Sequence, residues 1–217
     1  MIDALIKILL AYMLGSLMGG LLIGRLRGHV DIRQQGSGNA GATNAWRTQG
    51  PVFGIAVFVI DIAKGVIAAL LLPELPIPFL ESSSALGSWL PYLCGLAAVV
   101  GHLYPVFFSF RGGKGAATLI GIMFCLMTPL MPLAVLVWLG TLLITGMVGL
   151  ATMLAIAAVA VLANMHAFFS PAGVFSLLAL ALILYTHRAN IQRMREGNEN
   201  RFNKVRITYW LGGKRSE

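Results

Sequence analysis

The segment VFGIAVFVIDIAKGVIAALLL, residues 52–72, determines the class of fold. A helix needs about 20 mostly apolar residues to cross the hydrocarbon core of a bilayer. This segment has that length, and only Asp61 and Lys64 in it are charged. It therefore predicts a transmembrane helix.

The rest of the chain has the same character. Hydrophobic residues make up 58% and charged residues only 11% of its 217 residues, and the mean hydropathy is +0.82. These values lie outside the range of soluble globular proteins. The candidate spans are residues 4–24, 52–72, 89–108, 116–128, 130–144, 148–165 and 173–185. We predict an all-α integral membrane protein with about seven transmembrane helices and a single domain over residues 1–217. The fourth and fifth spans are short, and a five-span count is the alternative.

The basic residues predict the orientation. Every Lys and Arg except Lys7 and Lys64 follows the first, third or seventh span, whereas the loop 73–88 has two Glu and no cation. Cytoplasmic loops carry an excess of Lys and Arg. We expect the N-terminus outside and the C-terminus in the cytoplasm, with a basic tail over about residues 188–217. This topology explains the net charge of +8 without nucleic-acid binding.

Three polar clusters interrupt the spans, and either span count places them all at the cytoplasmic face. The first cluster contains Gly36, Ser37, Gly38, Asn39, Gly41, Thr43 and Asn44, followed by Arg47. Its glycines match GxGxxG, but a dinucleotide site needs a preceding β-strand, and a membrane helix precedes this cluster. Backbone N–H groups ahead of a helix, amides, hydroxyls and an Arg suit phosphate. The alternative is a polar loop that caps the second span.

The second and third clusters are also rich in donors. Residues 110–115, FRGGKG, lack the spacing of a Walker motif, but Gly112 and Gly113 permit close backbone approach beside Lys114. The alternative is an ordinary positive-inside turn. In the third cluster, His187 and Asn190 are three residues apart and would share a helix face, or His187 caps the helix end.

Polar residues also lie within the predicted spans. Asp61 and Lys64 are three residues apart in the second span, as either a functional pair or a neutralising structural pair. His102 is expected to form a hydrogen bond between helices. No metal-binding motif is present, and Cys94 and Cys125 lie within apolar segments.

Taken together, these residues resemble the acyl-phosphate-dependent glycerol-3-phosphate acyltransferases of bacteria, the PlsY type. The resemblance runs nearly from end to end. The matching motifs are Gly15-Ser16, Gly36-Ser37-Gly38-Asn39 through Thr43-Asn44 with Arg47, Asp61-x-x-Lys64-Gly65, Gly101-His102-x-Tyr104-Pro105-Val106-Phe107, Phe110-x-Gly112-Gly113-Lys114-Gly115 and His187-Arg188-x-Asn190-Ile191-x-Arg193.

The resemblance implies a seven-helix enzyme of phospholipid synthesis in the bacterial cell (inner) membrane, with its active site facing the cytoplasm. It would transfer a fatty acyl group from acyl phosphate to the 1-hydroxyl of sn-glycerol 3-phosphate, forming lysophosphatidic acid and phosphate. No cofactor or metal is implied, since acyl phosphate is already activated. The implied partners are the two substrates and the bilayer, and an enzyme that makes acyl phosphate is a further candidate.

We assign the candidate residues to roles in that reaction. Ser37, Gly38, Asn39, Gly41, Thr43 and Asn44 are assigned to acyl phosphate. Arg47, Lys114, His187 and Asn190 are assigned to glycerol 3-phosphate and to catalysis. Asp61, Lys64, His102, Gly112 and Gly113 are assigned supporting roles. The proton acceptor is either His187 or a phosphate oxygen of a substrate.

One motif departs from the family. Where the family often has Ser-Leu-[Ala/Gly]-Ser, this chain has Gly149-Leu150-Ala151-Thr152, so the first hydroxyl is missing, and Thr152 or Thr145 is the candidate replacement. The H-x4-D pattern of thioester-dependent acyltransferases is absent, which disfavours a thioester donor. A small transporter or a membrane scaffold remains the alternative class. A transporter predicts an internal repeat, and a scaffold predicts spans without convergent cationic loops.

Overall fold

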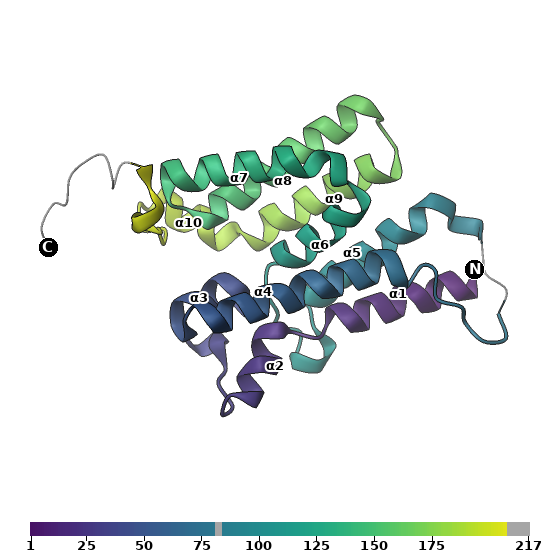
Figure 1. The fold of residues 1–217 in the computed structure, drawn as a ribbon, viewed down its shortest axis with the longest axis horizontal. Coiled ribbons are helices and arrows are strands. Elements are labelled where there is room, and N and C mark those ends of the chain that lie inside the picture. Colours follow the sequence, from purple (N-terminus) through teal and green to yellow (C-terminus); the bar gives the residue numbers. More distant parts are fainter. Residues whose placement is uncertain (81–83, 208–217) are drawn as a thin grey trace, which may run out of the picture. The chain divides into compact units, whose positions relative to one another are not determined.

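The computed structural model describes residues 1–80 and 84–207, and every regular element among them is helical (Figure 1). The α-helices are α1 (Ile2–Gly15), α2 (Gly19–Leu26), α3 (Ala42–Gln49), α4 (Pro51–Val66), α5 (Leu90–Leu103), α6 (Ala116–Leu126), α7 (Met131–Thr145), α8 (Val148–His166), α9 (Pro171–Thr186) and α10 (Arg188–Arg195). A π-helical turn, Ile67–Leu71, continues α4. The predicted all-α class is confirmed.

Several of these helices can cross a membrane. In the described part of the chain four segments are long and apolar enough: Pro51–Leu71, Leu86–Phe108, Thr128–Thr145 and Val148–Met165. The bent pairs α1–α2 and α9–α10 raise the number to six if each pair is one span, and α6 is a shorter apolar helix. The count of seven, like the orientation, stays a prediction.

The chain forms two compact units, Met1–Thr128 and Pro129–Glu217. Within the first unit α1 packs against α5, α4 against α6, and α3 against α4. Within the second, α8 packs against both α7 and α9. The single domain over residues 1–217 stays a prediction.

Glycines allow the helices of the first unit to approach closely. A methyl group added at Gly15 would collide with the backbone of α5, and one at Gly101 would collide with the backbone of α1. Gly65 and Gly121 form the same reciprocal arrangement between α4 and α6. Small residues at helix contacts are typical of membrane proteins, because the lipid supplies no hydrophobic force that drives helices together.

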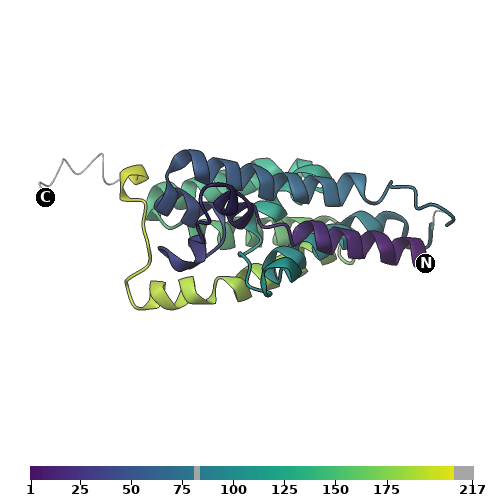
Figure 2. The ribbon, with the colours of Figure 1, turned by 90° about the horizontal axis from the view of Figure 1, so that it is seen from below.

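The first predicted span is not one helix. α1 ends at Gly15, α2 begins at Gly19, and their axes differ by 49° (Figure 2). The prediction of a continuous helix over residues 4–24 is therefore wrong. The break is stabilised from α4, because Nζ of Lys64 donates to the carbonyl oxygens of Gly15 at 2.9 Å and Leu17 at 3.2 Å.

Lys64 is itself neutralised within α4. Its Nζ lies 2.9 Å from Oδ1 of Asp61, and both side chains are almost completely buried. One ammonium group thus serves a buried carboxylate and two carbonyl groups released by the helix break. Irregular backbone at membrane depth requires such internal partners.

Two other predicted boundaries differ. The first polar cluster leads into the separate short helix α3 and not directly into the second span. Gly50, with φ of 89°, separates α3 from α4, which begins at Pro51. The third span loses its α-helical form after Leu103 and continues only as a 3₁₀ turn, Val106–Phe108, since Pro105 cannot continue the hydrogen-bonding pattern.

We predict that Lys64→Met destabilises the protein by about 3–5 kcal/mol, because it leaves the Asp61 carboxylate buried without its cation. The double variant Asp61→Asn/Lys64→Met should be less destabilised than Lys64→Met alone. Unfolding of the purified protein in detergent measures both. A Lys64→Met protein as stable as the wild type would contradict the stabilising role of Lys64 at the helix break.

Candidate active site

The first loop is organised by one buried amide. Oδ1 of Asn44 accepts hydrogen bonds from the backbone N–H of Ser37 at 2.8 Å and from its hydroxyl at 3.2 Å. Nδ2 of Asn44 donates to the carbonyl oxygens of Ile32, Gln35 and Asn39 at 2.8–3.0 Å. Asn44 is 2% exposed. It therefore shapes the loop, and its predicted direct contact with acyl phosphate stays a prediction.

The remaining residues of this loop surround the start of α3. Gly36 and Gly38 have φ values of 57° and 72°, a conformation that glycine adopts without strain. Oδ1 of Asn39 accepts a hydrogen bond at 3.0 Å from the N–H of Gly41, the residue before α3. Ser37 and Gly38 are exposed. The loop thus presents a hydroxyl and glycine backbone near the N-terminal end of a helix, and this arrangement suits an anion.

Two further predicted residues of the cluster lie on α3 itself. Thr43 belongs to its first turn and is half-buried, whereas Arg47 belongs to its last turn and is exposed. Arg47 is therefore carried by the short helix that directly follows the first loop.

The second loop, residues 108–115, contains the second cluster and folds back onto the end of α5. The N–H groups of Gly112 and Gly113 donate to the carbonyl oxygens of Leu103 at 3.2 Å and His102 at 3.1 Å. A Cβ atom on Gly113 would collide with the imidazole of His102. Lys114 follows as a half-buried residue, and only Gly115 separates it from the start of α6.

The imidazole beneath this loop belongs to the buried cluster around Lys64. Nδ1 of His102 lies 3.6 Å from Oδ1 of Asp61 and 3.3 Å from the hydroxyl of Thr118. Polar groups therefore run from the break between α1 and α2, through α4 and α5, to the backbone of Gly113. This arrangement fits the supporting roles predicted for Asp61, Lys64 and His102, and those roles stay predictions.

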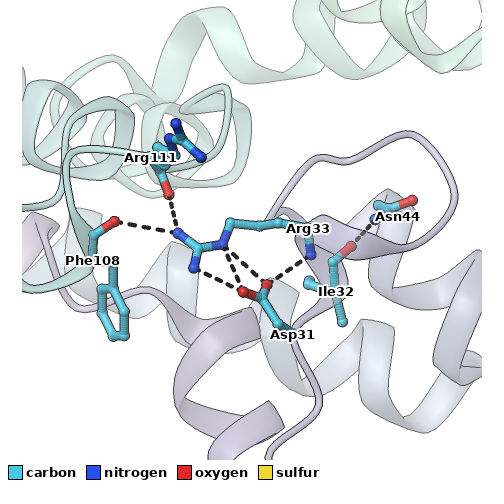
Figure 3. A network of polar contacts seen from close by, with 6 residues as sticks. All are labelled: Asp31, Ile32, Arg33, Asn44, Phe108 and Arg111. Atoms are coloured by element: carbon cyan, nitrogen blue, oxygen red, sulfur yellow. Dashed lines mark hydrogen bonds and ion pairs between the residues drawn. The ribbon is translucent and has the colours of Figure 1, made fainter.

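Arg33 joins the two loops (Figure 3). Its Nη1 donates to the carbonyl oxygens of Phe108 at 3.3 Å and Arg111 at 3.0 Å, both in the segment that leads to Lys114. Its Nε and Nη2 donate to the carboxylate of Asp31 at 2.8–3.2 Å. These side-chain hydrogen bonds hold the pKa of the Asp31 carboxyl below its usual value.

Sequence reasoning assigned Arg33 only to the positive-inside signal. The available sign was the Asp-x-Arg spacing, because an Asp two residues before an Arg can hold its guanidinium. The carbonyl acceptors could not be recognised from the sequence, because every residue has a backbone carbonyl group.

In the second unit, the third cluster lies at the bend of 55° between α9 and α10. His187 is the residue between these helices, so His187 and Asn190 do not lie on one continuous helix. The predicted shared face of a single helix is wrong in this respect, because the chain turns at His187. Nδ1 of His187 is 2.9 Å from the carbonyl oxygen of Ile183, which can only accept, so this nitrogen is the donor.

Asn190 is held by an acid that sequence reasoning missed. Its Nδ2 donates to Oε1 of Glu199 at 2.6 Å, and Nε of Arg193 donates to Oε2 of the same carboxylate at 2.8 Å. Glu199 is buried although it lies beyond the helix in the predicted tail. The helix α10 and this contact show that the start of the tail is folded.

The position of the missing family serine adjoins Asn190. A Cβ atom at Gly149 would lie 2.9 Å from Nδ2 of Asn190. The two candidate replacement hydroxyls have local partners: that of Thr152 donates to Val148, and that of Thr145 donates to Thr141. Neither candidate replacement is distinguished by these contacts.

The first and second clusters thus come together within the first unit, whereas the third belongs to the second unit. Convergence of all three clusters stays a prediction. What the first unit brings together is two glycine-rich loops, each with exposed or half-buried donors and each followed by a helix.

Comparisons with known proteins identify the family. The family model described as Glycerol-3-phosphate acyltransferase matches residues 5–197. Glycerol-3-phosphate acyltransferase of Aquifex aeolicus is 40% identical over 199 residues, which cover 92% of this chain and 99% of the relative. The protein of the same name from Geotalea daltonii is 40% identical over 205 residues, covering 94% of this chain and 100% of the relative.

Solved structures agree with this result. The chain is similar to crystal structures of PlsY (YgiH), an integral membrane glycerol 3-phosphate acyltransferase. Its glycerol 3-phosphate form has a TM-score of 0.82 and 38% identity, covering 97% of this chain and 99% of the other. Its lysophosphatidic acid form has a TM-score of 0.81 and 38% identity, covering 95% and 98%. The predicted resemblance is confirmed, and the chain belongs to the glycerol-3-phosphate acyltransferase family.

Proposed function

We propose that this membrane acyltransferase moves a fatty acyl group from acyl phosphate to the 1-hydroxyl of sn-glycerol 3-phosphate. The products are lysophosphatidic acid and inorganic phosphate. The observation that carries the proposal is the pair of glycine-rich loops that Arg33 joins within one unit. Each substrate carries a phosphate, so two adjacent anion sites match the two substrates.

The reaction requires placement more than a strong nucleophile from the protein. The substrate hydroxyl oxygen attacks the acyl carbonyl carbon, the C–O bond to phosphate breaks, and phosphate leaves with the bonding electron pair. The hydroxyl proton passes to an acceptor, and phosphate needs no further activation as a leaving group. Holding the two reactants in line supplies much of the rate enhancement, and fixed donors stabilise the developing charge.

The loops support a division of labour between the substrates. The exposed Ser37 and the backbone around Gly38 and Asn39 suit the phosphate of the acyl donor, which Gly41 and Thr43 border. Lys114 and Arg47 supply cations for glycerol 3-phosphate. Asn44 holds the first loop in shape through its hydrogen bonds.

His187 and Asn190 complete the proposed binding of glycerol 3-phosphate. The hydrogen bond from Nδ1 of His187 to Ile183 fixes its ring, and Glu199 fixes the amide of Asn190. Such fixed groups suit an orienting role. We propose that a phosphate oxygen of a substrate accepts the hydroxyl proton, with general-base action by His187 as the alternative.

The setting follows from the apolar helices and the basic loops. We place the enzyme in the bacterial cell (inner) membrane, with the loops facing the cytoplasm. The acyl chain would lie among apolar helices. An enzyme that makes acyl phosphate is the partner that this donor requires.

The donor is tested with purified protein, glycerol 3-phosphate and three donors in parallel: acyl phosphate, acyl-CoA and acyl carrier protein. We expect turnover with acyl phosphate, measured as lysophosphatidic acid formed. Robust turnover with acyl-CoA, and none with acyl phosphate, would show that the proposed donor is wrong.

For the cations, we predict that Lys114→Ala and Arg47→Ala each lower kcat/KM by orders of magnitude. Each change would remove the cationic partner of a substrate phosphate that is buried once bound, and such a loss costs about 2–5 kcal/mol. The exposed Arg195 serves as a control, and Arg195→Ala should keep activity near that of the wild type. Near wild-type kinetics from folded Lys114→Ala would remove Lys114 from the site.

The role of His187 is tested by the pH dependence of kcat in the wild type and in His187→Gln. If His187 orients substrate, the variant should be slower but keep the shape of the profile. General-base catalysis predicts a loss of about 10²–10⁴-fold. Disappearance of an ionisation near neutral pH, with unchanged substrate affinity, would identify His187 as the base. The exposed His29, replaced by Asn, is the control.

A further inference from the structure

Arg33 is placed to control the distance between the two loops. Its guanidinium makes a two-sided contact: one edge binds the Asp31 carboxylate, and Nη1 on the other side binds two carbonyl oxygens of the second loop. The backbone N–H of Arg33 also donates to Asp31 at 2.9 Å. Asp31 therefore fixes the direction in which the guanidinium points (Figure 3).

The same short segment connects to the first loop. Asn44 binds the carbonyl oxygen of Ile32, the residue between Asp31 and Arg33, and also binds Ser37. A continuous set of hydrogen bonds thus runs from Ser37 through Asn44 and the 31–33 segment to Phe108 and Arg111. These links are short and partly buried, so they limit relative movement of the two loops.

The acceptors on the second loop occupy a strained turn. Ser109 and Phe110, between the two carbonyl groups that Arg33 binds, have φ values of 56° and 57°. Residues other than glycine adopt this conformation only at a cost. The Phe108 ring is buried beside α2 and lies under the guanidinium of Arg25, 5.0 Å from its centroid. Arg33 therefore donates to the carbonyl groups on both sides of this turn.

We propose that Arg33 is a positioning residue, oriented by Asp31, which fixes the second loop against the first and thereby sets the separation of the two bound substrates. It need not touch either substrate. The expected effect on kinetics rests on the proposed function. The distance between the two loops affects the rate only if each loop holds one of two reacting substrates. A displacement of about 1 Å between reactants can cost ~10²-fold in rate.

The central variant is Arg33→Gln, with Arg27→Gln as the matched control. Arg27 is an exposed basic residue of the same stretch, and its guanidinium lies over the ring of Phe53 on α4. We expect Arg33→Gln to lower kcat/KM by ~10²-fold, with most of the loss in kcat. Arg27→Gln should behave as the wild type. Wild-type kinetics in folded Arg33→Gln would overturn the proposal.

Hydrogen exchange without substrate gives an independent readout. The amides of residues 110–113 donate to carbonyl oxygens of Pro105, Phe108, Leu103 and His102. If Arg33 holds the turn, these amides should exchange faster in Arg33→Gln than in the wild type or Arg27→Gln. Unchanged exchange there overturns the positioning role even if activity falls.

Arg33→Lys separates geometry from charge. A lysine keeps the positive charge but cannot bind a carboxylate through a rigid fork while also binding two carbonyl groups. We expect it to resemble Arg33→Gln. Full recovery of kinetics and exchange by Arg33→Lys would show that charge alone matters and would overturn the proposal.

If Arg33→Gln does not fold, Asp31→Asn decides by the same two measurements, since it removes the ion pair and keeps the guanidinium. We expect smaller changes in the same direction, and no change in either measurement would overturn the proposal. Turnover of the wild type with each donor tests the proposed function separately. If acyl-CoA were the working donor, exchange and relative rates with acyl-CoA would still decide the role of Arg33.

Discussion

The first unit depends on the contacts that the buried ammonium group of Lys64 makes. This group lies within an apolar helix, where an isolated charge is costly, and it meets one carboxylate and two carbonyl oxygens there. Without such a donor, the carbonyl groups of Gly15 and Leu17 would lose the partner that they have inside the protein, which is costly at membrane depth. The break in the first span and the buried charge therefore stabilise each other.

The loops are built outward from this buried pair. Asp61 lies next to His102, and the backbone of His102 binds the second loop directly. The reciprocal glycines of α1 with α5 and of α4 with α6 bring the same helices close enough for these contacts. Rigid helices thus support a part of the molecule that carries no regular structure of its own. A site that works by placement benefits from such support.

The all-helical class and one buried ion pair were predictable because local sequence determines them. Apolar length predicted the helices, and the three-residue spacing predicted that Asp61 and Lys64 lie together. The break after Gly15 was not predictable, because its stabilising donor lies 49 positions along the chain. The same holds for Arg33, whose acceptors are 75 and 78 positions away. Glu199 was missed because the stretch around it was interpreted only as a basic tail, and its partner Asn190 lies nine positions away.

The contacts of Arg33 with the second loop involve main-chain oxygens only. Side chains at positions 108 and 111 can therefore be exchanged without removing an acceptor, provided that the turn keeps its shape. Pairwise covariation, which detects compensating side-chain changes, would carry no signal for this contact. An engineer who varies the second loop to alter substrate preference has freedom in the side chain of Arg111, whereas an inserted or deleted residue would shift both carbonyl groups out of reach.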